Sequence, residues 1–269
     1  SSGSAAAVAV GHVPLAIGTQ TNGSVIRPAS FCGVFGFKPT RGMISRTGVL
    51  QTSVSLDQLG TFGRTLEDAA LLADVISGYD QRDPESFAHA RPAMAKGAGD
   101  DAPVEPDFAW FNLPFNDRLS DAARDGIDSV LDILGERVLQ MDPANTLSNL
   151  VAVQARIHEY EIAQHQADVF ANHWDQISDT LKPVIIRARQ ITKTEYDDAL
   201  EVKASAQAFF EDLFTEFDAI IAPAAAGEAP KFGGGTGDPI FCTLWTLAGL
   251  PCVTLPLLVG ETGLPIGVQ

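Results

Sequence analysis

Basic residues and long apolar runs are both scarce in this 269-residue chain. It has 18 Lys and Arg against 34 Asp and Glu, which leaves a formal charge of −16 at pH 7. A surface this acidic repels phosphate backbones, and no basic run offsets it, so we expect no direct binding of nucleic acid. No window has the roughly 18 uncharged apolar residues of a membrane helix. Because Pro251 and Pro256 interrupt the apolar stretch 250–259, we expect no membrane span.

Cysteine is rare: the chain has three, Cys32, Cys242 and Cys252, all in apolar surroundings. An odd number of thiols in such surroundings favours reduced, buried side chains in a cytoplasmic protein, with a disulfide as the open alternative. The remaining composition, 45% hydrophobic and 19% charged, is ordinary for a globular protein. It excludes a disordered or collagen-like chain.

The sequence also lacks the features of a natural N-terminus. It begins with Ser1-Ser2-Gly3-Ser4, without an initiator Met, a basic leader or a cleavage pattern. An Ala-rich pattern over 4–10 follows at once and predicts a buried helix. Residues 263–269 stop on the way into a strand. We therefore expect this sequence to be a piece of a longer protein.

Helix and strand signals alternate along the chain, which predicts an α/β fold. Hydroxyl residues that can cap a helix predict helix starts at Thr65, Ser120 and Thr192. Residues 82–106, with four Pro, two Gly and five acidic side chains, predict a long loop or linker. Apolar patterns predict further strands at 15–21, 108–115, 219–222 and 253–258, and further helices at 150–172 and 243–250.

The most unusual stretch is 18–28, GTQTNGSVIRP, in which hydroxyls and glycines surround Ser24. A nucleophilic serine needs an exposed Oγ, a base, and backbone N–H donors aimed at the developing oxyanion. A tight Asn22-Gly23 turn could present successive N–H groups in this way. Arg27 could hold a carboxylate or carbonyl oxygen. On spacing alone, the alternative is a polar turn whose serine only caps the next element.

A histidine base and a metal site are both disfavoured. The chain has no G-x-S-x-G elbow, and its histidines lie in no recognisable triad context. His158, Glu161 and His165 share one helical face and could begin a metal site, but no further ligand is marked. We therefore expect a solvated or hydrogen-bonded helix face, and no metal.

Several long segments together resemble the amidase signature family. The N-terminal ones are SSGSAAAVAVG, GTQTNGSVIRPASFCGVFGFKPTRG and SLDQLGTFGRTLEDAALLADVISGYD, and the C-terminal ones are FDAIIAPAA, LWTLAGLPCVTLP and GLPIGVQ. The resemblance covers both ends and the helix order between them, whereas the acidic stretch 81–107 matches no motif. It implies the amidase-signature fold, a large mixed β-sheet flanked by helices on both faces. It also implies a single domain over 1–269, without the family's N-terminal part and extreme C-terminus.

The resemblance further implies a Ser-Ser-Lys triad that needs no cofactor. Ser24 matches the nucleophile, which forms an acyl-enzyme, and the backbone N–H groups of Thr21, Asn22, Gly23 and Ser24 match the oxyanion hole. The family usually has Gly where Asn22 stands. The second triad serine, whose peptide bond is cis, falls one residue before Ser1, and the catalytic Lys lies further upstream. Both are therefore expected outside this sequence.

Other positions match the family in supporting roles. Ser1 and Ser2 would neighbour the second triad serine, where they could form hydrogen bonds, and Arg27 would support the site or bind substrate. Lys38 lies in the GFKPT segment, which has a structural role in the family, so it is a poor substitute for the missing base. Asp57, in SLDQ, is expected to organise a loop near the active site.

The function we expect is that of an amidohydrolase acting on the C–N bond of a small, linear amide. One alternative is the glutaminase subunit of a tRNA-dependent amidotransferase, whose motifs are similar and which would work with a tRNA-binding partner. The LWTLAGLPCVTLP segment looks more like that of free-standing amidases, so this alternative ranks second. Another is a non-catalytic relative that binds a small ligand or partner. The sequence does not name the amide, and it leaves open whether the protein is a homodimer.

Overall fold

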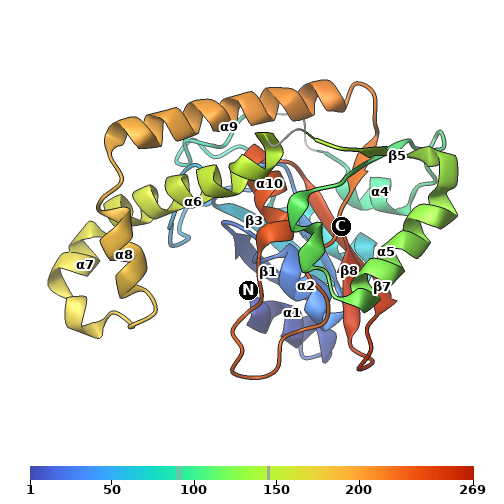
Figure 1. The fold of residues 1–269 in the computed structure, drawn as a ribbon, viewed down its shortest axis with the longest axis horizontal. Helices are drawn as coiled ribbons and strands as arrows, with labels where there is room; N and C mark the ends of the chain where they lie inside the picture. The colour runs from blue at the N-terminus through green and yellow to red at the C-terminus, as the bar shows by residue number, and fades with distance from the viewer. Residues whose placement is uncertain (89, 91, 144–145) are drawn as a thin grey trace.

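The computed structural model describes residues 1–88, 90, 92–143 and 146–269 (Figure 1). Its strands, in chain order, are β1 Leu15–Gln20, β2 Phe35–Lys38, β3 Gln58–Gly63, β4 Phe108–Phe111, β5 Val138–Met141, β6 Ala219–Ile221, β7 Cys252–Val259 and β8 Pro265–Val268. Its α-helices are α1 Ser2–Ala9, α2 Ile26–Cys32, α3 Leu66–Ile76, α4 Met94–Gly99, α5 Asp121–Leu134, α6 Thr146–His165, α7 Ala167–Asn172, α8 Lys182–Ala188, α9 Lys193–Leu213 and α10 Ile240–Ala248.

Two sheets within the described residues meet at the C-terminal strand. The larger sheet has the order β1-β3-β2-β7-β8, with antiparallel neighbours, and the smaller has the order β5-β4-β6, with parallel neighbours. Just after β6, Ala222 and Gln269 exchange two backbone hydrogen bonds of 2.9 and 2.8 Å. The two sheets are thereby linked, and the mixed α/β architecture expected from the sequence is confirmed.

Helices cover both faces of the larger sheet. Thr61 and Phe62 are consecutive in β3, so their side chains point to opposite faces. Phe62 is fully buried against α1 and α2, in a cluster with Ala5 and Ala29. On the other face, Thr61 Oγ1 donates a 2.7 Å hydrogen bond to the carbonyl of Ala69 in α3. This arrangement confirms the expected helices on both faces.

The main core surrounds α10, every residue of which is buried. This helix packs against α6 and α9, and α9 runs above it in Figure 1. Phe210 of α9 meets Trp245 of α10 edge to face, with ring centroids 5.6 Å apart. Burial of such a ring contributes about 2–3 kcal/mol. The core therefore holds α10 in one position, which matters because α10 also contacts the candidate site.

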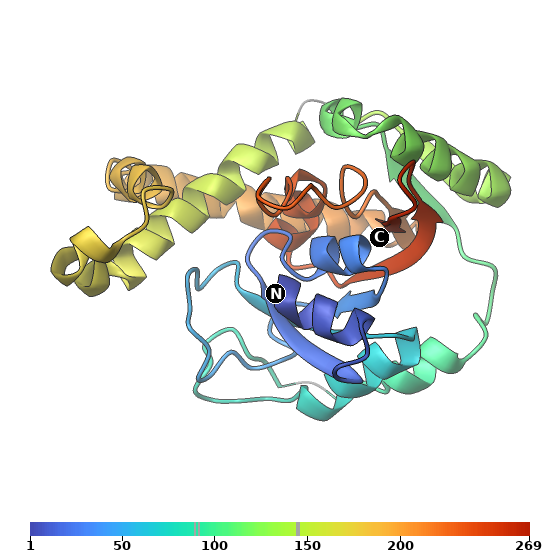
Figure 2. The ribbon, with the colours of Figure 1, turned by 90° about the horizontal axis from the view of Figure 1, so that it is seen from below.

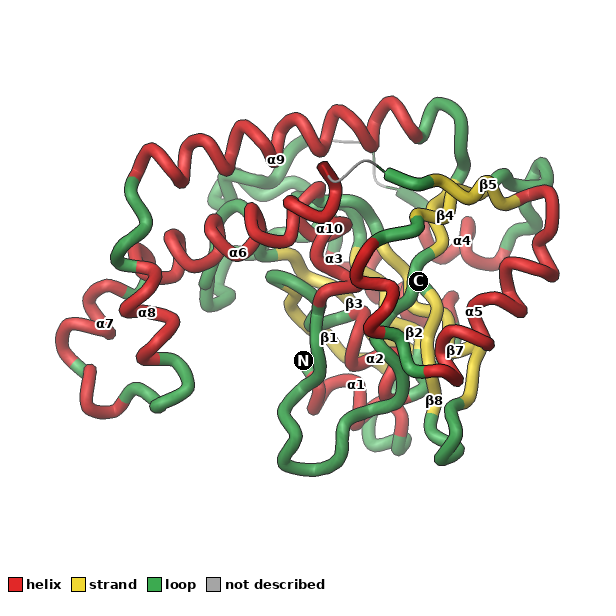
Figure 3. The backbone as a smooth tube through the Cα atoms, in the orientation of Figure 1, coloured by secondary structure: helices red, strands yellow, loops and turns green. Residues whose placement is uncertain are grey.

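Helices α6 and α9 extend beyond the sheets as an arm (Figure 2). The shorter helices α7 and α8 form its tip, and Figure 3 shows the strands at the centre of the molecule, away from this tip. α6 and α9 are the longest helices in the described part of the chain, with 20 and 21 residues. Yet no helix among the described residues is both long and apolar enough to cross a membrane.

The helix starts predicted from local capping residues are confirmed. Thr65 and Ser120 accept the backbone N–H of Asp68 and Ala123, and Thr192 forms the full capping box with Glu195. Each of these caps lies within three residues of the helix start, so a local pattern is sufficient to find it.

Helix α4 was not predicted, because the group that binds its N-terminus lies about 20 residues away in the sequence. The α4 helix lies within 82–106, where the sequence predicts a loop. Its first N–H groups, of Met94 and Ala95, donate to the carboxylate of Asp74 in α3, at 2.8 Å each. Residues 89 and 91 of the same segment lie outside the described residues.

Candidate active site

Ser24 lies in the turn between β1 and α2. Its side chain is half-buried, and its Oγ has no hydrogen-bond partner among the described residues. The preceding residue, Gly23, lies close to α10: a Cβ at this position would be 3.1 Å from the Cβ atoms of Cys242 and Pro239. Glycine at position 23 therefore allows the turn to pack directly against the buried helix.

The start of α2 is bound by Gln20, the last residue of β1. Gln20 is fully buried, and its Oε1 accepts the backbone N–H groups of Val25 and Ile26 at 2.8 and 3.0 Å. Its Nε2 donates to Thr246 Oγ1 of α10 at 2.9 Å. One buried amide thus satisfies the N–H groups that follow Ser24 and links the turn to α10.

Asn22 connects the turn to two helices through its side chain. Its Nδ2 donates to Gln154 Oε1 of α6 at 3.2 Å, and its Oδ1 accepts from Thr243 Oγ1 of α10 at 2.7 Å. No non-glycine residue in the described part of the chain has a positive φ. Asn22 therefore adopts this turn without left-handed strain, although the family usually has Gly here.

In the backbone of the turn, the carbonyls accept hydrogen bonds, whereas the N–H groups have no acceptor within the described residues. The carbonyls of Thr21 and Asn22 accept from Gln154 Nε2 at 3.0 Å and from Thr246 Oγ1 at 2.5 Å. The N–H groups of residues 21–24 donate to no group within the described residues. Successive N–H groups without acceptors are the donors that an oxyanion hole requires.

Asp57 joins this turn to the loop before β3. Its carboxylate accepts from Thr21 Oγ1 at 2.5 Å and from the backbone N–H groups of Thr52 and Ser53 at 2.7 and 2.9 Å. The expectation that Asp57 organises a loop is therefore confirmed. Through Thr21, that loop is tied to the segment that carries Ser24.

Glu161 of α6 anchors the same loop from the other side. It is buried and accepts hydrogen bonds from Ser53 Oγ, from Ser55 N–H and Oγ at 3.1 and 2.5 Å, and from Tyr196 at 2.6 Å. Burial by itself raises the pKa of a carboxylate, but these donors hold the pKa of Glu161 below its usual range.

His158 and His165 complete the helix face that the sequence marked as a weak metal candidate. Burial lowers the pKa of His158, and the nearby carboxylates of Asp57 and Glu161 partly oppose that shift. His165 is exposed. No group of three or more His, Cys, Asp or Glu side chains suited to a metal ion occurs among the residues that the structure describes. At Glu161 the hydrogen-bonded face expected from the sequence is confirmed.

Replacing Glu161 with Gln is expected to lower the free energy of unfolding by about 2 kcal/mol, because an amide cannot accept all four hydrogen bonds. Urea denaturation monitored by circular dichroism measures it. The matched control is Asp197→Asn, which removes an ion pair with Lys193 in which the two side chains are 49% and 66% exposed. That change is expected to cost less than about 1 kcal/mol. Equal losses for the two variants would contradict the prediction.

The pH dependence of this effect follows from the sign of the shift. Because the pKa of Glu161 is lower in the folded state, folding favours the carboxylate. Its contribution is complete above the unfolded pKa of about 4.3 and is lost as the pH falls through the folded value. The stability difference between wild type and Glu161→Gln is therefore expected to shrink as the pH is lowered below about 4.

The remaining predicted support residues are found in three different settings. Ser1 Oγ donates to the carbonyl of Thr19 at 3.0 Å and accepts its N–H at 2.9 Å, beside the end of β1. Ser2 is exposed at the start of α1. Arg27 is buried, and its guanidinium donates to Thr236 Oγ1 at 3.4 Å. None of these contacts tests a role in catalysis, so all three roles stay predictions.

Lys38 is embedded in the structure behind the turn. It is fully buried and donates to Gln58 Oε1 at 2.5 Å and to the carbonyl of Leu250. Gln58 in turn donates to the carbonyl of Thr246 at 3.0 Å. Burial lowers the pKa of Lys38. These contacts join β2, β3 and α10, which fits the structural role that the family motif implies.

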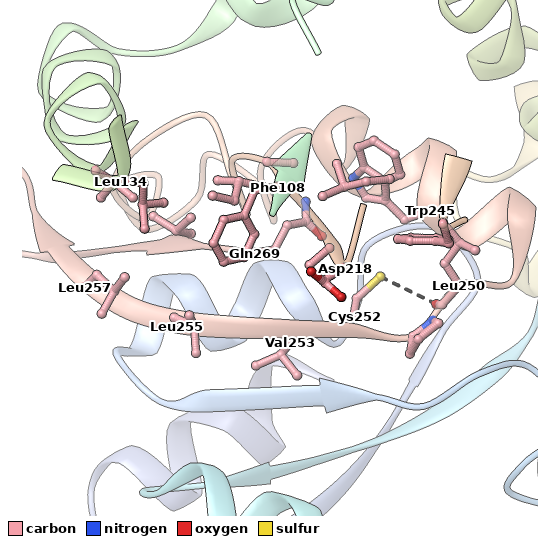
Figure 4. Close-up of a pocket in the computed structure, with 18 of the residues that line it drawn as sticks. Phe108, Leu134, Asp218, Trp245, Leu250, Cys252, Val253, Leu255, Leu257 and Gln269 are labelled. Carbon is pink, nitrogen blue, oxygen red and sulfur yellow. Dashed lines mark hydrogen bonds between the residues drawn. The ribbon is translucent and has the colours of Figure 1, made fainter. Parts of the chain in front are cut away.

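An apolar cavity of about 630 Å³ lies over β7 (Figure 4). Cys252 lines it, with its Sγ directed toward the carbonyl of Leu250. Trp245 is buried and also lines this cavity. Ser24 is not among the lining residues, so this cavity is separate from the turn.

The side chains that hold the turn were not predicted from the sequence. Gln20 lies inside the recognised GTQTNGS segment, and Thr243 and Thr246 lie one turn apart in TLWTLAGLP. A polar residue in an otherwise apolar helix, such as Thr246, was the available signal, because a buried hydroxyl needs a partner. Gln154 carried no comparable signal.

Residues 1–269 match the sequence model of the Amidase family, and the chain belongs to that family. Among curated relatives, it is 33% identical to a glutamyl-tRNA(Gln) amidotransferase subunit from Clostridium botulinum strain Eklund 17B. That alignment covers 100% of this chain and 62% of the relative. This chain therefore spans less than two thirds of the length of the protein that it resembles.

Two solved structures show the same fold. One belongs to a vestigial protein complex that reveals the evolutionary origins of an s-triazine catabolic enzyme; its TM-score is 0.89 at 30% identity, over 99% of this chain and 61% of the other. The second is a glutamyl-tRNA(Gln) amidotransferase subunit from Thermotoga maritima, with a TM-score of 0.83 at 28% identity, over 99% and 60%. The amidase-signature fold expected from the sequence is confirmed.

Proposed function

We propose that this chain carries the nucleophile of an amidohydrolase that cleaves a small-molecule carboxylic amide. The observation that supports the proposal is the turn at Ser24, where a hydroxyl without a partner in the described residues follows backbone N–H groups without acceptors. Ser24 Oγ attacks the carbonyl carbon, and the N–H groups of Thr21, Asn22, Gly23 and Ser24 stabilise the resulting oxyanion.

The reaction is acyl transfer in two stages. A base takes the hydroxyl proton of Ser24 as the C–O bond forms, and the C–N bond breaks as the leaving nitrogen gains a proton. Water then attacks the acyl-enzyme, which releases the carboxylic acid and restores the hydroxyl. Only protons and an acyl group move, so the proposal requires no cofactor. The base is the Lys and second triad serine implied by the family resemblance, both outside this sequence.

Fluorophosphonate labelling of the full-length gene product tests the proposal. The probe is expected to modify wild-type protein on the peptide that contains Ser24, located by mass spectrometry, and to leave Ser24→Ala unmodified. The matched control is Ser129→Ala, which removes an exposed serine of α5 and is expected to label like wild type. Absence of labelling in folded wild-type protein would instead favour a non-catalytic, ligand-binding relative.

A second candidate function is the glutaminase subunit of a tRNA-dependent amidotransferase. The names of the curated relatives favour it, since several at 30–34% identity are subunits of glutamyl-tRNA(Gln) amidotransferase. Ammonia release from glutamine and from a panel of small amides distinguishes the two. A free-standing amidase hydrolyses small amides without a partner protein. Glutamine hydrolysis that depends on an added tRNA-binding partner would instead establish the second function.

A further inference from the structure

Three peptide units precede Ser24, and their carbonyls determine where the adjoining N–H groups point. A trans peptide is planar, with its C=O and N–H on opposite sides. A donor that fixes the carbonyl of Thr21 therefore fixes the N–H of Asn22. The carbonyl of Asn22 fixes the N–H of Gly23 in the same way, and the carbonyl of Gly23 fixes that of Ser24.

Each of these carbonyls is held by a different donor. The carbonyl of Gly23 accepts from the backbone N–H of Arg27 at 3.0 Å, a bond that forms with α2 itself. The carbonyls of Thr21 and Asn22 depend instead on side chains, Gln154 Nε2 of α6 and Thr246 Oγ1 of α10. The orientation of two of the three N–H groups thus rests on side chains far away in the sequence.

The direction of the hydrogen bond from Thr246 is set by Gln20. Gln20 Oε1 faces the N–H groups of Val25 and Ile26, so its amide nitrogen must face Thr246 Oγ1. The hydroxyl of Thr246 therefore accepts from Gln20. Its own hydrogen faces two carbonyls, and that of Asn22, at 2.5 Å, is closer than that of Cys242 in the preceding turn of α10, at 2.9 Å. Gln20 and Thr246 are both fully buried, so water does not compete for these groups.

The amide of Gln154 is oriented by the same kind of argument. Its Oε1 accepts from Asn22 Nδ2, so its Nε2 faces the carbonyl of Thr21. Gln154 is only 2% exposed. The side chain of Asn22 is oriented in turn by Thr243, whose hydroxyl donates to Asn22 Oδ1. This hydrogen bond contacts the side chain of Asn22 and not its backbone.

We infer that Gln154 and Thr246 are positioning residues that orient the N–H groups of Asn22 and Gly23 toward the oxyanion of the reacting amide. The inference rests on the proposed function of Ser24. It assigns to α6 and α10 a role in transition-state stabilisation, because N–H groups that are correctly aimed in advance need no reorganisation during the reaction. Neither side chain is assigned a contact with the substrate.

The experiment compares steady-state and single-turnover amide hydrolysis by Thr246→Val, Thr246→Ser and Gln154→Met in the full-length protein. Thr246→Val and Gln154→Met remove the donors at nearly constant size, and kcat is expected to fall about tenfold to hundredfold with KM little changed. Thr246→Ser keeps the hydroxyl and is expected to recover most of kcat. The matched control, Thr61→Val, removes a fully buried hydroxyl that donates to the carbonyl of Ala69 in α3 and not to the turn, and its loss of kcat is expected to be under about threefold.

The outcomes separate this inference from the proposed function. If folded wild-type protein hydrolyses no amide and is not labelled at Ser24, the proposed function fails, and the inference fails with it. If wild type is active and Ser24→Ala is not, but Thr246→Val and Gln154→Met keep wild-type kcat, only the inference is overturned. A rise in KM at constant kcat would also overturn it, since it would indicate substrate binding. Should Thr246→Val fail to fold, Gln154→Met decides alone.

Discussion

Replacing Ser24 with alanine in the full-length protein is expected to lower kcat for amide hydrolysis about 10⁴-fold or more. Loss of the nucleophile removes the acyl-enzyme route, and only binding and oxyanion stabilisation remain. The half-buried Oγ without a hydrogen-bond partner in the described residues, and the open N–H groups before it, are the structural basis for this expectation. Single-turnover release of ammonia at saturating amide measures the loss.

The control for that loss is Ser129→Ala, at an exposed site on α5, which is expected to keep wild-type kcat. Substrate binding by Ser24→Ala, measured by calorimetry, is expected to persist, because the change removes one hydroxyl and leaves the N–H groups in place. If Ser24→Ala retained activity within tenfold of wild type, another residue would be the nucleophile, and the assignment of the turn would be wrong.

Replacing Arg46 with Met is expected to lower the free energy of unfolding by about 3–5 kcal/mol. Arg46 and Asp83 form an ion pair whose side chains are 2% and 1% exposed, with Nη2 and Oδ1 2.6 Å apart. Arg46 Nη1 also donates to the carbonyl of Val54 at 2.5 Å. Removal of Arg46 leaves the carboxylate of Asp83 buried without its counter-charge. Urea denaturation measures the loss.

A double variant shows whether the buried charge causes this loss. Asp83→Leu in the Arg46→Met background removes the uncompensated carboxylate, so the double variant is expected to be more stable than Arg46→Met alone. If Asp83→Leu instead lowered the free energy of unfolding of Arg46→Met further, the uncompensated charge would not be the cause of the loss.

The same ion pair predicts how stability depends on acid. Hydrogen bonds from Arg46 lower the pKa of Asp83 to about 2, below its usual value of about 3.9. Because folding favours the ionised form, this contribution is complete above about pH 4 and is lost as the pH falls toward 2. In Arg46→Met, that part of the acid dependence is expected to disappear.

The sequence predicts those parts of the site that depend on neighbouring residues. Ser24 and the N–H groups before it lie in one short motif, so both the motif and its tight turn are visible locally. Gln154 and Thr246 are more than 100 residues further along, and only the packing of α6 and α10 brings them to the turn. The same limit explains why α4, whose N-terminus is bound by Asp74, was expected to be a loop.

Two serines at the start of α1 also protect the edge of the larger sheet from pairing with strands of other molecules. β1 is the last strand on its side of the sheet in the described residues, and it pairs only with β3 there. A strand edge with unused N–H and C=O groups is a template for intermolecular pairing and aggregation. Ser1 Oγ binds both backbone groups of Thr19, and Ser4 Oγ binds the carbonyl of Ile17. These two hydroxyls occupy the outward edge, so a foreign strand would have to displace α1 before it could extend the sheet.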